Sequence, residues 1–467
     1  MSEQHTDQRQ QNEFEDDAGV DNMSQASTDH YLDHEPFETY QGKVLKLCHL
    51  LWSEHPAEGF SIERLRGGSS NRIIGIRVTD AGGRPSGHSD LGTTSHPNPS
   101  QPASKCALID SDSSVAAKPR QETALPETSD KQSENLNLPS GNYILRVPRW
   151  GSQNFEHEIA MLRLVKRSVA VDVPLAIHFD ITNGDSNPLG SPYVLQHRVP
   201  GERLDDVWCK LNHTQRLLIG LDLARLYIQL MKITNTSGGI PDFKQPPTAD
   251  GMLKTYDYEF PSDNTESKNV IIPQPPVDML CERLARWGRD YPNANGDSPY
   301  YGAIEMVRHM QATNGTFEST GPLYYLNHGD LFPRNIMVEL PTQNSAFVSG
   351  VLDWDDAHFA PAVVSFAPPA WLWVTAFWKD YDDEGFLDEQ DIWEVAGAEP
   401  EDETSKEIKN LFDMAVGNKF SHHAYSPDAK VARKIWKAAY ETIGKSWIEK
   451  DVERMYESWK VVQGRVD

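Results

Sequence analysis

The run His328 to Asp355, HGDLFPRN continuing to VLDWD, constrains this chain more than any other feature of its sequence. It places an acid, Asp330, five residues before an amide, Asn335, and a second acid, Asp353, after a short apolar run. Phosphoryl transfer needs these groups in this order: one Asp takes the proton of the acceptor hydroxyl, and an Asn and a further Asp hold Mg²⁺ on the nucleotide phosphates. We therefore predict catalysis by Asp330 and Mg²⁺ binding by Asn335 and Asp353.

The same run resembles a known catalytic loop. The D-x-x-x-x-N spacing is that of the protein kinases, with Asp353 at the place of the DFG Asp. Gly329 follows His328 where a protein kinase has Arg, and the later triplet is Asp-Trp-Asp. HGDLFPRNIMV with LDWDDA is similar to the aminoglycoside phosphotransferase and choline kinase family, and most of all to its fungal members. The resemblance implies a two-lobed, kinase-like α+β fold, with a small N-lobe built on an antiparallel sheet and a mainly helical C-lobe.

The resemblance also implies a function. We expect ATP- and Mg²⁺-dependent transfer of the γ-phosphate to a hydroxyl of a small molecule. The alternative is a catalytically weak pseudokinase that acts as a nucleotide-binding interaction module. A kinase acting on protein side chains is a third possibility, which the absence of the loop Arg and of any APE-like stretch disfavours.

Four neighbours of the predicted site residues leave their roles open. His328 is expected to brace the loop by hydrogen bonding rather than to exchange protons. Asp355 and Asp356 are either secondary metal or substrate contacts, or caps of the loop. Arg334 contacts either a phosphate or a nearby acid.

A glycine-rich turn is predicted upstream, within the N-lobe. Residues 60–78 have the pattern strand, turn, strand, because Ile74, Ile76 and Val78 alternate with other residues. Backbone N–H groups at such a turn can approach phosphate oxygens closely, although a plain β-turn is the alternative. The predicted phosphate loop consists of Gly67, Gly68, Ser69, Ser70 and Asn71.

The next predicted strand, 142–148, carries Arg146 where kinases have a Lys that pairs with phosphates and with a helix Glu, and the resemblance to fungal members implies that Arg is common at this position. Glu158, on the helix that follows, lies at the pairing position, but Glu156 or Glu158 could also be a solvated helix charge. Arg is a wide planar fork and Lys a compact point charge, so the substitution supports the pseudokinase alternative.

The segment YVLQHRVPG resembles the hinge between the lobes. Backbone groups near Gln196 and Arg198 would meet the adenine edge there, whereas His197 is expected to face solvent. Beyond the hinge, an apolar stripe predicts a core helix over residues 214–234.

The expected domain boundaries follow from changes in amino-acid composition along the chain. Only 38% of the 467 residues are hydrophobic, which indicates that part of the chain is unstructured. We predict a disordered acidic tail over residues 1–36, an N-lobe over 37–200 and a C-lobe over 201–467. The N-lobe is expected to contain a disordered insertion at about residues 81–139, rich in Ser, Pro, Thr and Gly, which is a hypothetical target of phosphorylation.

The distribution of charge argues against nucleic acid as a partner. The net charge is −25, of which residues 1–40 contribute −10 and residues 380–413 contribute −12, so the remainder sums to −3. The chain therefore offers no basic face for nucleic acid. The acidic segment 380–413 suggests a cationic acceptor, but a solvated, partly disordered loop is the preferred interpretation.

Four cysteines without C-x-x-C pairing indicate neither a zinc site nor a disulfide framework. With a polar, acidic N-terminus, they predict a cytoplasmic protein, the nucleus being left open. Residues 359–378 carry no charge but contain three prolines, so we expect a buried segment under the catalytic loop and no membrane span. The acceptor, the choice between ATP and GTP and the oligomeric state have no signal in the sequence.

Overall fold

A computed structural model describes thirteen stretches of the chain, and all structural statements below concern these. They are residues 35–65, 71–79, 138–149, 155–182, 187–244, 247–256, 270–290, 292, 298–317, 321–379, 387, 392–440 and 446–463. The predicted tail up to residue 34 and nearly all of the predicted insertion lie outside them.

The chain divides into two compact units. The first comprises Met1–Ser152 and His178–Gln196, and the second comprises Gln153–Ile177 and His197–Asp467. This division differs from the predicted lobe boundary at residue 200, because residues 153–177 group with the C-terminal part of the chain.

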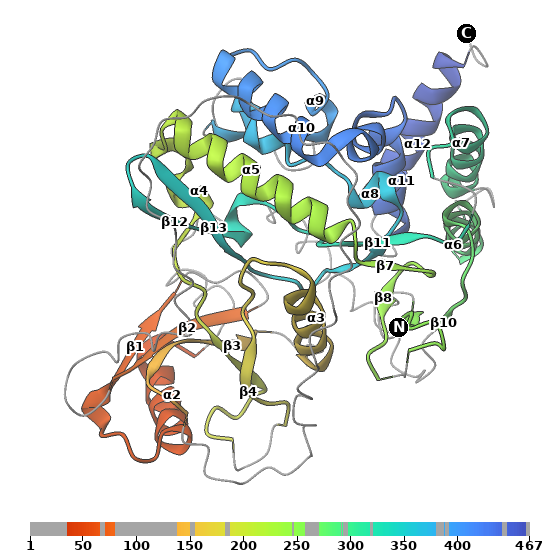
Figure 1. Cartoon of the computed structure of the whole chain (residues 1–467). Helices are drawn as coiled ribbons and strands as arrows, with labels where there is room; N and C mark the ends of the chain where they lie inside the picture. The colour runs from red at the N-terminus through yellow and green to blue at the C-terminus, as the bar shows by residue number, and fades with distance from the viewer. Residues whose placement is uncertain are drawn as a thin grey trace, which may run out of the picture. The chain divides into compact units, whose positions relative to one another are not determined.

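The first unit is built on a five-stranded sheet (Figure 1). Its strands are ordered β1-β2-β3-β5-β4, and β1, β2 and β3 pair antiparallel. The strands are β1 Phe60–Arg64, β2 Asn71–Val78, β3 Gly141–Pro148, β4 Ala176–Asp180 and β5 Tyr193–His197. Helix α2, Phe37–Leu51, precedes the sheet, and Trp52 at its end packs on Tyr143 of β3 with ring centroids 5.2 Å apart.

The second unit is mainly helical (Figure 1). Its helices are α3 Phe155–Ser168, α4 Leu204–Val207, α5 His213–Leu230, α6 Pro276–Asp290, α7 Pro299–Asn314, α8 Ala362–Ser365, α9 Ile392–Val395, α10 Glu403–Tyr425, α11 Ala429–Tyr440 and α12 Ser446–Val462. Helix α5 begins at a capping box between Asn212 and Gln215 and packs on α10, where Tyr227 meets the rings of Phe412 and Phe420 edge-on. The predicted mixed α+β architecture, with an N-terminal antiparallel sheet and a helical C-terminal part, is thus confirmed.

Three small sheets complete the second unit, with strand orders β10-β9-β8, β14-β11-β7 and β13-β12-β6. Their strands are β6 Glu202–Arg203, β7 Thr234–Asn235, β8 Ile240–Pro241, β9 Thr255–Tyr256, β10 Val270–Ile271, β11 Tyr324–Asn327, β12 Ile336–Thr342, β13 Ser345–Val351 and β14 His358–Ala360. The helix predicted to run to residue 234 ends at Leu230, because the chain turns there into β7.

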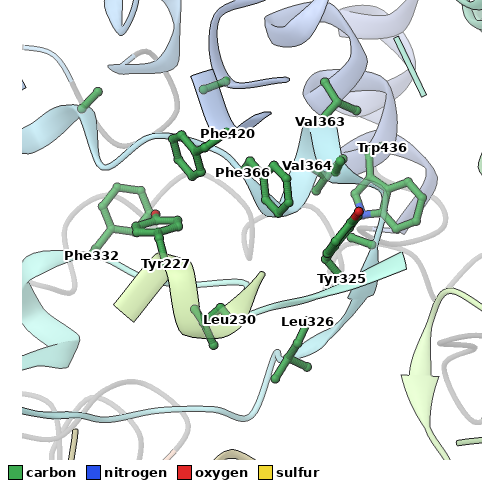
Figure 2. Close-up of a cluster of buried hydrophobic side chains, with 14 of the residues drawn as sticks. Tyr227, Leu230, Tyr325, Leu326, Phe332, Val363, Val364, Phe366, Phe420 and Trp436 are labelled. Atoms are coloured by element: carbon green, nitrogen blue, oxygen red, sulfur yellow. The ribbon is translucent and has the colours of Figure 1, made fainter. Parts of the chain in front are cut away.

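A hydrophobic cluster holds β11 against the helices of the second unit (Figure 2). Tyr325 of β11 packs on Phe366, just after α8, with ring centroids 4.8 Å apart, and Phe366 stacks on Phe420 of α10. Tyr227 and Leu230 of α5 lie on the same cluster (Figure 2). The strand that leads into the catalytic motif is therefore firmly packed.

The acidic segment differs from the expected loop. Residues 380–386 and 388–391 lie outside the described stretches, but 403–413 form the first half of α10. Asp402 caps this helix by accepting a hydrogen bond from the Ser405 N–H at 2.9 Å. Glu403 and Glu407 are exposed on this helix, whereas Ile408 and Phe412 are buried.

Residues 359–378 form short turns rather than one helix. They include α8 and the 3₁₀ turns η5, Ala370–Leu372, and η6, Thr375–Trp378. The Trp371 indole N–H donates to the Leu331 carbonyl at 3.3 Å, which confirms that this segment packs against the predicted catalytic loop. Within the stretches that the structure describes, no helix has the length and apolar character needed to cross a membrane.

Candidate active site

The loop after β11 turns sharply at Gly329, whose φ is +86°. A Cβ atom at this position would lie 2.7 Å from the Asp356 carbonyl oxygen. Only glycine permits both this backbone conformation and this close approach. Gly329 therefore allows the loop to lie against the segment that carries Asp353, Asp355 and Asp356.

His328 is buried and braces the loop at two points. Its Nε2 donates to the Leu352 carbonyl at 2.9 Å, and its Nδ1 accepts the Asp330 N–H at 3.2 Å. The ring also packs on Trp354, with centroids 4.3 Å apart. Burial lowers the pKa of His328 to about 4, against an opposing effect of the Asp330 charge, so the ring is neutral near pH 7. This arrangement favours the bracing role expected for His328.

Asp330 has a donor on each carboxylate oxygen. The 3₁₀ turn η4, Pro333–Asn335, brings the following residues back over the loop. The Asn335 side-chain Nδ2 donates to Asp330 Oδ2 at 2.7 Å and to the Asp330 carbonyl at 2.9 Å. Arg334 Nη2 donates to Asp330 Oδ1 at 2.5 Å. Of the two interpretations left open for Arg334, the structure therefore shows the contact with an acid.

A backbone hydrogen bond of the preceding residue, Leu352, links Asp353 to Asn335. In the β12–β13 hairpin Ile336 pairs with Val351, and the Leu352 N–H donates to the Asn335 carbonyl at 2.8 Å. Asp353 follows directly, is exposed, and has a φ of +60°. Positive φ is uncommon outside glycine and is often found at functional positions. The structure thus brings the three predicted residues to one end of the hairpin.

The donor set fits a magnesium ion. Within the described stretches, the hydrogen bonds of the Asn335 side chain all use Nδ2, which leaves its Oδ1 as a potential ligand. An amide oxygen and a carboxylate are hard oxygen ligands, and Mg²⁺ is usually bound by one or two carboxylates together with phosphates and water. No group of three or more His, Cys, Asp or Glu residues suited to a metal occurs among the described residues, and such a magnesium site does not need one.

The predicted nucleotide residues fall in both units. Gly67, Gly68, Ser69 and Ser70 lie outside the described residues, so the phosphate loop stays a prediction there. Asn71 begins β2 and lies on the same sheet face as Arg146, because Asn71 pairs with Pro148 and Ile73 with Arg146.

Asn71 and Arg146 are both buried, and Asn71 Oδ1 lacks a hydrogen-bond partner among the described residues. A ligand donor would satisfy this oxygen.

The other predicted nucleotide contacts are also described. Gln196 is buried in β5 of the first unit, and Arg198 is exposed just after β5 in the second unit. Glu158 is buried on α3 of the second unit. The ion pair predicted between Arg146 and Glu158 stays a prediction, because the two residues belong to different units.

Sequence reasoning did not single out Trp371 and Phe377. Trp371 holds the Leu331 carbonyl, and Phe377 stacks on Phe332 with centroids 6.3 Å apart. The signal that could have indicated them is the density of aromatic residues within 371–378, which include Trp371, Trp373, Phe377 and Trp378. A cavity of about 490 Å³ in the second unit is lined by β6, the start of α5 and the β12–β13 turn, and by none of the predicted site residues.

The family with the description "Phosphotransferase enzyme family" matches residues 133–398, which is more than half of the chain. The chain belongs to this family. The match spans the catalytic loop and the strand of Arg146, but it begins after residues 67–71, so the phosphate loop of this phosphotransferase rests on the sequence pattern alone. The comparison with curated proteins found no match.

Solved structures similar to the phosphotransferase include two classes of small-molecule kinase. The GDP complex of aminoglycoside 2'-phosphotransferase-IIIa is 13% identical, with a TM-score of 0.38, over 90% of this chain and 99% of that one. Plasmodium vivax ethanolamine kinase is 9% identical, with a TM-score of 0.40, over 95% and 97%. Choline kinase from Cryptosporidium parvum is 10% identical, with a TM-score of 0.35, over 91% and 98%. Similarity this low does not carry a ligand or an acceptor over to this chain.

Family membership confirms the broader part of the resemblance predicted from HGDLFPRN and LDWDDA. The more specific resemblance to fungal members stays a prediction.

Proposed function

We propose that this phosphotransferase transfers the γ-phosphate of ATP to a hydroxyl group of a small molecule. The proposal is carried by two hydrogen bonds. The Asn335 side chain donates to the Asp330 carboxylate, and the Asn335 carbonyl accepts from the N–H of Leu352, the residue before Asp353. A proton acceptor and two oxygen ligands for a metal then lie at one end of one hairpin. This is the set of groups that phosphoryl transfer requires.

In this mechanism each residue has one task. Asp330 orients the acceptor hydroxyl and takes its proton as the hydroxyl oxygen attacks. Asn335 and Asp353 hold Mg²⁺, which, when bound, neutralises charge on the nucleotide phosphates. His328 is neutral and fixes the loop backbone. Asn71, Arg146 and the predicted Gly67–Ser70 turn are proposed to contact the nucleotide.

The rival is a nucleotide-binding module with little activity. It is supported by Arg146, which stands on β3 where kinases carry a Lys. A planar guanidinium cannot reproduce the point charge of an ammonium at a phosphate. The rival predicts nucleotide binding without transfer.

Substituting Asp330→Asn distinguishes the two. We expect Mg²⁺-dependent ATP turnover, measured as ADP release with a panel of small hydroxyl compounds, to fall by about 10³-fold, because the amide cannot accept the proton. Nucleotide binding should remain. Asp205→Asn is a matched control, because Asp205 is also a partly exposed Asp paired with a nearby arginine, Arg203, in the same unit. Equal, low turnover in the wild type and Asp330→Asn would support the rival.

A further inference from the structure

Arg334 forms an ion pair with the proposed base, Asp330. Its guanidinium contacts Asp330 Oδ1 at 2.5 Å, while Oδ2 is held by Asn335. Asn335 is buried, with 6% of its surface exposed, whereas the side chains of Asp330 and Arg334 are 23% and 37% exposed. Of the two residues that contact the carboxylate, Arg334 is thus the more exposed. Each carboxylate oxygen has a second lone pair, so an acceptor hydroxyl can bond Oδ1 beside the guanidinium.

The guanidinium is held in place by aromatic rings. It lies over the ring of Phe332, 5.1 Å from the centroid, and Phe332 in turn stacks on Phe377. Phe332 is 8% exposed, so this support is largely buried. A cation stacked in this way and ion-paired at the same time keeps one position better than an isolated surface arginine.

We propose that Arg334 selects the acceptor by charge, so that the phosphorylated compound carries an uncharged or anionic group, rather than an ammonium group, next to its reactive hydroxyl. The inference rests on the proposed function, since it takes Asp330 as the base. When the acceptor hydroxyl is hydrogen-bonded to Asp330 Oδ1, a group two bonds away from that hydroxyl lies within about 6 Å of the guanidinium. A unit charge at that distance changes binding affinity on the order of tenfold. Asp330 alone would attract an ammonium group, and the ion pair with Arg334 cancels that attraction.

This inference opposes the cationic acceptor suggested by the acidic segment 380–413. The described second half of that segment is the capped helix α10, whose buried residues pack on α5. Arg334, by contrast, contacts the reacting carboxylate itself. Its charge therefore acts at the shorter distance.

Three acceptors of equal length test the inference: glycolate, ethylene glycol and ethanolamine. Each offers a primary hydroxyl, and the neighbouring group is anionic, neutral or cationic. Phosphorylated product is measured by mass spectrometry with Mg²⁺ and ATP for the wild type and Arg334→Met. In the wild type, where the ion pair cancels the attraction, we expect kcat/KM for ethanolamine not to exceed that for ethylene glycol. In Arg334→Met the uncompensated charge of Asp330 should raise kcat/KM for ethanolamine about tenfold above that for ethylene glycol.

Two further variants complete the design. Arg216→Met is a matched control, because Arg216 also stacks on an aromatic ring, Trp208 at 5.2 Å, and should keep the wild-type order. Arg334→Lys keeps the charge and should keep the order at a lower rate, even if Arg334→Met does not fold.

Preference of the wild type for ethanolamine, or an unchanged order in Arg334→Met, overturns the inference and leaves the proposed function standing. A changed order in Arg334→Lys overturns it as well. Absence of product with every acceptor for every protein contradicts the proposed function itself, and the inference with it.

Discussion

His328 shows how a single buried residue fixes the geometry of the loop. Its two ring nitrogens join the Leu352 carbonyl to the Asp330 N–H, so one side chain ties the strand before Asp353 to the loop of the proposed base. Both contacts require the neutral ring with the proton on Nε2. Protonation would place a donor at Nδ1, where the Asp330 N–H now donates.

Replacing His328 with Gln should flatten the dependence of stability on pH. The pKa of His328 is about 4 in the folded chain and about 6.5 when unfolded, so below pH 6.5 the unfolded state binds the additional proton. The stability that depends on the neutral ring is complete above about pH 6.5 and is lost as pH falls toward 4. We expect the wild type to lose about 2 kcal/mol more than His328→Gln between pH 7 and pH 4.5.

Urea denaturation at the two pH values measures this difference. Burial also lowers the pKa of His358, but that residue titrates in both proteins, and its effect cancels in the comparison. Parallel losses of stability in the wild type and His328→Gln would show that His328 is not kept neutral by the fold.

At the scale of elements, the catalytic loop is supported by the 3₁₀ turn η5. Trp371 lies in this turn and Trp373 directly follows it, and both rings are buried. Trp371 donates its indole N–H to the Leu331 carbonyl, next to Asp330, whereas Trp373 donates to the Ala396 carbonyl at 3.2 Å, next to α9. Trp371 therefore supports the loop, and Trp373 is a nearby position that can serve as a control.

Phe substitution at each tryptophan separates positioning from stability. Trp371→Phe and Trp373→Phe each remove one indole hydrogen bond and should each cost about 1 kcal/mol of stability. Only Trp371→Phe should lower kcat, by about tenfold, because the Leu331 carbonyl and the adjoining Asp330 lose a fixed position. Steady-state kinetics and chemical denaturation measure the two effects, and an equal fall of kcat in both variants would contradict a positioning role for Trp371.

The features that the sequence predicted correctly are those that depend on residues close together in the chain. Asp330, Asn335 and Asp353 belong to one loop and hairpin, so their spacing alone implies that they meet. Helix α10 was not predicted over its acidic half, because fourteen acids within residues 380–413 obscure the apolar spacing of Ile408 and Phe412.

In the molecule as a whole, the residues predicted to contact the nucleotide are distributed over both units. Asn71, Arg146 and Gln196 belong to the first unit, whereas Arg198 and Glu158 belong to the second. No local periodicity relates these residues to one another, so the resemblance suggested all of them except Asn71, which the glycine-rich turn indicated. The contact between Arg334 and Asp330 is local, but a cation four residues after an acid has several possible partners, so the sequence left two open.

In the proposed mechanism Asp330 and Asp353 have different tasks at one site, proton transfer for Asp330 and metal binding for Asp353. Calorimetric titration with a non-hydrolysable ATP analogue, with and without Mg²⁺, tests it most directly in the wild type, Asp330→Asn and Asp353→Asn. We expect Mg²⁺ to strengthen binding at least tenfold in the wild type and in Asp330→Asn, and to have little effect in Asp353→Asn. An equal effect of Mg²⁺ on binding in all three proteins would show that Asp353 does not hold the metal.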